Sequence, residues 1–159
     1  MTSTVDDDAL LAQVHAEEQE LQFPRFDHAA AWALGQWLVA TATERQLPIA
    51  VSIRFGRQRV FHAALPGSSA DNDGWLDRKY RSVEYFGTAS LAVGASFRKK
   101  GRDFATSSGL DPSRYCDSGG AFPLLVGGML AGVVGVSGLT QLEDHALVVE
   151  ALRVAAAKV

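Results

Sequence analysis

The sequence lacks the features that mark secreted or membrane-spanning proteins. It has one cysteine, Cys116, so no internal disulfide can form, and a reducing, cytoplasmic location is the simplest expectation. The first eight residues hold three consecutive acids and no basic or long apolar segment, unlike a signal peptide. The most apolar stretch, 124–139, is interrupted by five glycines and is shorter than the roughly 20 residues that a spanning helix needs. We therefore expect no membrane partner.

Basic residues are also not in excess. Lys and Arg total 15 against 18 Asp and Glu, a net charge of −3, whereas proteins that bind phosphate backbones usually carry a strong positive charge. The one basic run, 98–102, has no interleaved aromatic residues and fits a helix end. We therefore expect no nucleic-acid partner.

Several catalytic and metal-binding motifs are missing as well. The four histidines and single cysteine have no zinc-site spacing, so we expect no metal site of that kind. The glycine-rich segments lack the Lys-Ser/Thr ending of a P-loop and the spacing of a nucleophile elbow. A hydrolase using Ser137 would need a base and an oxyanion hole that the sequence does not place.

What is present is the composition of one globular domain, residues 1–159, with 47% hydrophobic and 21% charged residues. Two hairpins are predicted, around Gly56 and around Gly127, and helices precede, separate and follow them. Hairpins imply antiparallel pairing, so we expect an α/β fold of the α+β type, with a central, largely antiparallel sheet and helices packed on it. The predicted helices are 5 or 6 to 20, 28–45, one capped by Asp71 or Asn72 and running to 86, 88–100 and one from 140, with a short turn or helix at 111. The predicted strands are 49–55, 59–65, 122–126 and 130–137.

The passage from Phe61 to Lys79 has the residues most suited to a binding site. Asn72, Trp75 and Lys79 follow one another at helical spacings of three and four, so they share one side of the predicted helix. Free N–H groups at a helix N-terminus favour an anion. The imidazole of His62 and the hydroxyls of Ser68 and Ser69 lie shortly before the N-terminus of this predicted helix. The candidate ligand-binding residues are His62, Ser68, Ser69, Asn72, Trp75, Arg78 and Lys79.

A purely structural interpretation of the same passage stays open. Asp71 and Asp73 would repel an anion and are good helix-capping residues. In that interpretation Trp75 belongs to the core, while Arg78 and Lys79 form a solvated face. Farther along the chain, the helix dipole explains Asp144, and we expect a surface position for His145 and tight packing around the glycines.

Six segments carry a resemblance to a known family: 18–21, 61–67, 71–75, 119–123, 136–139 and 143–149. Through them the chain resembles the uncharacterised branch, with a yeast cytosolic member, of the haem-degrading HbpS-like and GlcG-like domain family. The resemblance implies a profilin-like fold with helices on both faces of the sheet, and a homo-oligomer. It also implies haem binding or degradation, as in some members.

Two functions follow as hypotheses. The first is a small-molecule-binding domain for haem or another tetrapyrrole, with His62 as axial ligand or acid/base and Arg78 or Lys79 holding a propionate. The second is a non-enzymatic, oligomeric adaptor that binds other proteins, suggested by the small residues of 91–95 and by the glycine-rich second hairpin. The residues leave open whether the protein is an enzyme.

Overall fold

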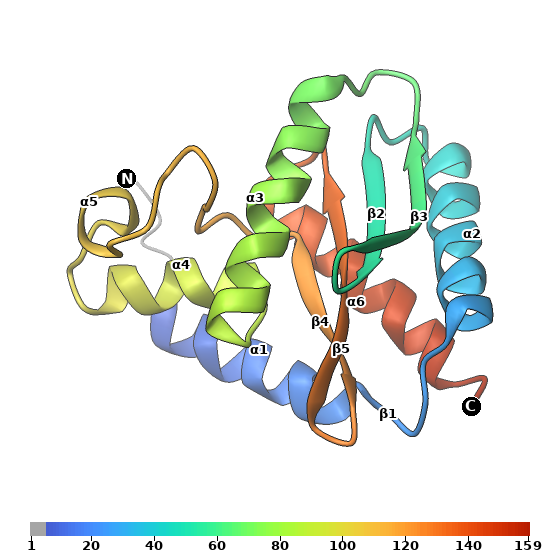
Figure 1. Ribbon diagram of the computed structural model, residues 1–159, viewed down its shortest axis with the longest axis horizontal. Coiled ribbons are helices and arrows are strands. Elements are labelled where there is room, and N and C mark those ends of the chain that lie inside the picture. The colour runs from blue at the N-terminus through green and yellow to red at the C-terminus, as the bar shows by residue number, and fades with distance from the viewer. Residues whose placement is uncertain (1–5) are drawn as a thin grey trace.

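The chain folds around a five-stranded sheet with strand order β1-β4-β5-β2-β3 (Figure 1). The computed structural model describes residues 6–159. Three pairings, β2 with β3, β2 with β5 and β4 with β5, are antiparallel, which confirms the predicted sheet. Its strands are β1 (Gln22–Phe23), β2 (Ala50–Phe55), β3 (Gln58–Ala64), β4 (Ala121–Val126) and β5 (Met129–Ser137).

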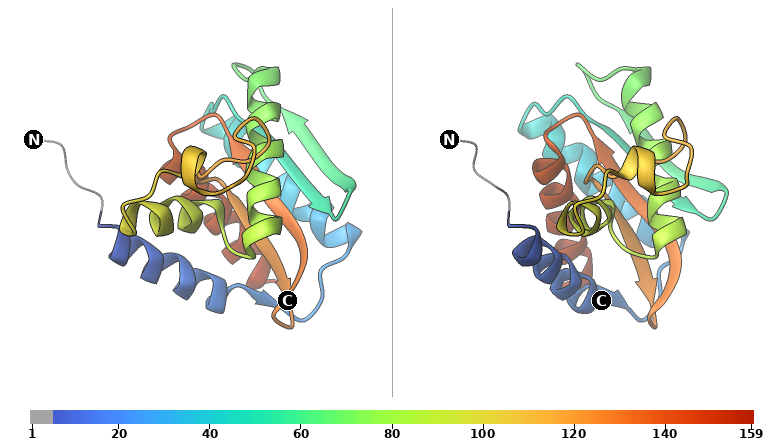
Figure 2. Two further views of the ribbon diagram at one scale, coloured as in Figure 1. Left: turned by 60° about the vertical axis from the view of Figure 1, so that its left-hand side comes forward. Right: turned by 90° about the vertical axis from the view of Figure 1, so that its left-hand side faces the viewer.

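Helices cover both faces of this sheet, as expected. α3 packs on β5, β4 and β2, while α2 and α6 pack on the opposite face (Figure 2), and α1 lies along α4. Phe61 of β3 approaches Gly35 on α2, whereas the next residue, His62, reaches Asp73 on α3. Among residues 6–159, no helix is long and apolar enough to cross a membrane. The helices are α1 (Asp7–Glu20), α2 (His28–Glu44), α3 (Ala70–Phe86), α4 (Ser90–Lys99), α5 (Phe104–Ser107) and α6 (Gln141–Ala156).

The predicted start of α3 was wrong by a few residues. Ser69 is the N-cap, and the backbone N–H of Ser69 donates to Asn72 Oδ1 at 2.9 Å, which makes a capping box. Asp71 and Asn72 therefore lie inside the helix. The alternative start of the first helix at Val5 lies outside the described residues.

Two short elements were not predicted. The turn predicted at 111 is present, but the single turn of helix that precedes it, α5, was missed. The short strand β1 pairs in parallel with β4 and was missed, because Phe23-Pro24 has the pattern of a helix end.

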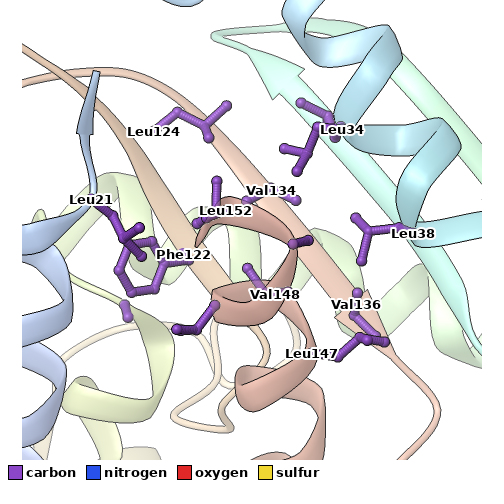
Figure 3. Packing of buried hydrophobic residues seen from close by; sticks show 14 of the residues in the cluster. Leu21, Leu34, Leu38, Phe122, Leu124, Val134, Val136, Leu147, Val148 and Leu152 are labelled. Atoms are coloured by element: carbon purple, nitrogen blue, oxygen red, sulfur yellow. The ribbon is translucent and has the colours of Figure 1, made fainter. Parts of the chain in front are cut away.

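The main core lies between the sheet and the layer of α2 and α6, where Phe122, Leu38 and Leu152 are fully buried (Figure 3). The small residues 91–95 are buried in the same chain, where α4 packs against α1. A Cβ on Gly94 would overlap the Asp117 carbonyl, so this glycine allows a close backbone approach. The small residues that suggested a subunit contact thus pack within the monomer.

Candidate functional site

A polar hollow of about 290 Å³ lies between the start of α3, the end of β5 and the start of α6. We call it the Lys79 hollow. It brings together Asn72, Trp75 and Lys79, the three residues predicted to share one helix side. The residues that line it are Asp71, Asn72, Trp75, Lys79, Ser118, Ser137, Gly138, Leu139, Gln141 and Asp144.

Lys79 is the most constrained group of this hollow. It is 3% exposed, and its Nζ donates to the Val136 carbonyl and to Asp144 Oδ2, both at 3.1 Å. The other carboxylate oxygen of Asp144 accepts from the Leu139 N–H at 3.0 Å. Burial raises the pKa of Asp144 above its ordinary value, although the attraction of Lys79 opposes the shift. The solvated-face interpretation of Lys79 was therefore wrong, and Asp144 is an ion-pair partner as well as a helix-terminal acid.

Asn72 links the start of α3 to the end of β5. Its Oδ1 accepts the capping bond from Ser69, and its Nδ2 donates to Ser137 Oγ at 3.3 Å. One side-chain amide thus fixes both the first helical turn and a wall of the hollow. Within the described residues, no histidine or carboxylate is hydrogen-bonded to Ser137, so a Ser-based hydrolase finds no support in this geometry.

His62 lies outside the hollow. Its Nε2 is 2.6 Å from Asp73 Oδ1, so the acid predicted to cap α3 instead orients this imidazole. Because Asp73 holds Nε2, the imidazole presents its other nitrogen, Nδ1, in a fixed direction. Metal-binding histidines are oriented by a second partner in the same way. The pair fits an iron ligand chemically, and the His62 side chain is 32% exposed.

The remaining predicted residues also lie outside the lining. Ser68 Oγ donates to the Leu65 carbonyl at 2.6 Å, and Ser69 caps α3. The Arg78 guanidinium stacks 4.2 Å from the centre of the Trp75 ring, so it supports a residue that does line the hollow. Sequence reasoning missed Asp144, Gln141 and Ser118, because these residues come from segments far away in the chain.

His145 is buried, so the prediction of a surface position was wrong. It is 2% exposed, and its Nε2 is 3.0 Å from Glu17 Oε2 on α1. Burial by itself would raise the pKa of Glu17, but hydrogen bonds from His145 and Gln13 outweigh it and lower that pKa. This second buried pair ties α6 to α1.

The Glu17 pair predicts a loss of stability in acid. The pKa of Glu17 is lower in the folded state than its ordinary value of 4.5. The ionised Glu17 side chain therefore contributes fully to the free energy of unfolding above pH 4.5, and this contribution is lost as the pH falls through the folded-state pKa. Denaturant unfolding between pH 7 and pH 3 should therefore give a shallower acid decline for Glu17→Gln than for the wild type. Glu20→Gln, at an exposed pair on the same helix, is the control and should keep the wild-type decline. Equal profiles for all three proteins would contradict the assignment.

The fold and the polar hollow define a small α/β domain with a pocket at the end of the central strand of a largely antiparallel sheet. Residues 26–153 match the family model described as haem degrading protein HbpS-like, and the chain belongs to this family. A UPF0303 protein of Streptomyces avermitilis is 55% identical over 145 residues, which cover 89% of this chain and 88% of that protein. The UPF0303 protein ZMO1353 of Zymomonas mobilis is 43% identical and covers 92% of this chain and 80% of that protein.

Solved structures agree with this fold. Yeast Ybr137w superposes with a TM-score of 0.85 at 26% identity, over 94% of this chain and 90% of that chain. PduOC, solved as a haem complex, gives a TM-score of 0.68 at 19% identity, over 80% of this chain and 93% of that chain. The expected relation to the branch with a yeast member is confirmed.

Proposed function

We propose that this chain is a small-molecule-binding domain and that the Lys79 hollow receives a polar group of the ligand. The observation that carries the proposal is a lysine 3% exposed, held by two partners at the edge of a hollow with amide and hydroxyl groups. Small-molecule sites commonly orient their ligands with a few fixed polar groups, and their volumes begin at roughly 300 Å³. A hollow of about 290 Å³ suits a compact polar molecule or the polar arm of a larger one.

Haem is the first ligand to test. The family description and the haem complex of PduOC support it, and the Asp73–His62 pair supplies a suitable iron ligand. His62 pairs with Ser52 on β2, and Ala50 of β2 pairs with Ser137 at the hollow. Two strand spacings, about 10 Å, separate β3 from β5, and the offset of two residues along the strands brings His62 and Ser137 to about 12 Å apart.

A tetrapyrrole would straddle the first turn of α3. Consecutive residues of that turn face the two sides, because Asp73 contacts His62 and Asn72 contacts Ser137. The polar hollow is too small for the macrocycle itself, so only a propionate would enter it. Binding of haem is the step we propose.

A haemin titration tests the proposal. The wild-type protein should give a Soret shift that saturates at one haemin per chain, and His62→Ala should abolish the shift by removing the iron ligand. Ser118→Leu, which fills the hollow, should weaken binding about tenfold, the equivalent of roughly 1.4 kcal/mol. His15→Ala, an exposed histidine on α1, is the matched control and should behave as wild type.

Three outcomes bear against the proposal. The absence of a saturable shift would exclude haem. A shift that persists in both His62→Ala and Ser118→Leu would place the haem elsewhere. Equal affinity for haemin and for iron-free protoporphyrin would remove His62 from its role as iron ligand.

The alternative, an oligomeric adaptor, loses its original motivation. The small residues 91–95 are buried within the monomer, and Gly135 of the second hairpin packs against Leu76 of the same chain. Homo-oligomer formation and a cytoplasmic location stay predictions, and light scattering of the purified protein would measure the first.

A further inference from the structure

A second and larger hollow, of about 780 Å³, lies between the β2–β3 turn, the later part of α3 and the segment that precedes β4. All three tyrosines of the chain line it: Tyr80, Tyr85 and Tyr115. Four arginines line it as well, against a single carboxylate, in a chain whose net charge is −3. We call it the Arg–Tyr hollow. Its chemistry differs from that of the Lys79 hollow, and it is independent of the function proposed above.

Most of the positive charge in the Arg–Tyr hollow is not neutralised. Arg54 forms an ion pair with Asp77, but among residues 6–159 neither Arg57, Arg81 nor Arg114 is paired with a carboxylate. Arg81 Nη1 donates to the Arg114 carbonyl at 3.2 Å, which holds the segment before β4 against α3. Guanidinium groups bind phosphate oxygens with two parallel hydrogen bonds, so a cluster of them favours a phosphorylated anion.

The tyrosines supply two different surfaces. Tyr85 is 62% exposed, and its ring centre lies 5.9 Å from that of Tyr115 at an angle of 75°, so a flat ligand can stack on an open aromatic face. Tyr80 is half-buried, and its hydroxyl donates to the Gly56 carbonyl. Burial, together with the nearby Glu84, raises the pKa of Tyr80 to about 12, so this phenol adds no negative charge at neutral pH.

We propose that the Arg–Tyr hollow binds a phosphorylated compound that carries an aromatic ring, of the class of a nucleoside diphosphate. Arg57 and Arg114, both exposed, would hold the phosphates, Tyr85 would stack on the face of the base, and Tyr115 would contact the edge of the base. The volume lies within the roughly 300–1,000 Å³ typical of small-molecule sites.

Isothermal titration calorimetry of the full chain with ADP tests this proposal. We expect saturable binding that weakens with added salt, because phosphate contacts are ionic. The double variant Arg57→Gln/Arg114→Gln should weaken binding at least about tenfold. Tyr85→Ala should weaken it by about the same factor, since stacking on an aromatic side chain contributes to the affinity for a base. Arg59→Gln, an exposed arginine on the same hairpin but outside this hollow, is the matched control.

Further probes make each half of the proposal falsifiable. Inorganic phosphate that binds as tightly as ADP would overturn the role of the tyrosines, and adenosine that does so would overturn the role of the arginines. No heat with ADP, or the same affinity in the double variant, would overturn the site. The substituted side chains are exposed, so far-UV circular dichroism should report the wild-type fold for each variant.

Discussion

A Lys79→Met variant is expected to lose about 3–5 kcal/mol of unfolding free energy at neutral pH, because it leaves the buried Asp144 carboxylate without its partner. Both side chains of this pair are almost inaccessible, with 4% and 3% exposure, so water cannot replace the lost ammonium. The lost bond to Val136 adds an unsatisfied carbonyl. Urea unfolding at pH 7 measures the difference.

The loss should become smaller in acid. Burial already raises the pKa of Asp144 above 3.8 and Lys79 opposes that shift, so removal of Lys79 raises the pKa further. Protonation then neutralises the buried carboxyl as the pH falls, which removes most of the cost. A double variant, Lys79→Met/Asp144→Leu, should recover much of the stability at pH 7, since no buried charge remains.

The control for this prediction is Lys99→Met. Lys99 pairs with Asp8 at 2.6 Å, but the two side chains are 55% and 71% exposed, so solvent and salt screen their attraction. We expect almost no change in stability. Equal losses for Lys79→Met and Lys99→Met would contradict the buried-pair interpretation.

Gly120→Ala is expected to destabilise the protein by about 2–6 kcal/mol, the sum of backbone strain and overpacking at about 1–3 kcal/mol each. Gly120 has a φ of +132°, a conformation that L side chains rarely adopt. An added Cβ would lie 2.6 Å from the Val136 carbonyl oxygen and 2.7 Å from Lys79 Nζ. The added methyl group would therefore clash with the backbone of β5 and with the buried Lys79–Asp144 ion pair, and neither can move freely.

Gly74→Ala is the matched control, with an effect of the opposite sign. Gly74 lies inside α3, and no heavy atom would approach its Cβ within 4 Å. Alanine should therefore stabilise the fold by about 0.4–1 kcal/mol, through its smaller loss of backbone entropy. Thermal and urea unfolding of both variants measure the two effects, and a stabilising Gly120→Ala would show that the site geometry is wrong.

Much of the fold and part of the candidate site could be predicted from local patterns. The glycines at 56 and 127 mark both hairpins, and the 3.6-residue period places Asn72, Trp75 and Lys79 on one side of α3, where they line one hollow. Such features depend on neighbours within a few residues. The start of α3 was harder, because Ser69, Asp71 and Asn72 are all good caps and only the backbone geometry selects Ser69.

The sequence by itself thus determined β2 to β5, the helices other than α5, and the polar side of α3, while only the tertiary structure decided what that side contacts. Lys79 is buried because β5 and α6 bring Val136 and Asp144 to it, from 57 and 65 residues away. His145 is buried because α1 covers it and supplies Glu17, 128 residues away. Burial of an ionisable group depends on a partner that offsets the cost of desolvation, and that partner comes from packing between distant segments.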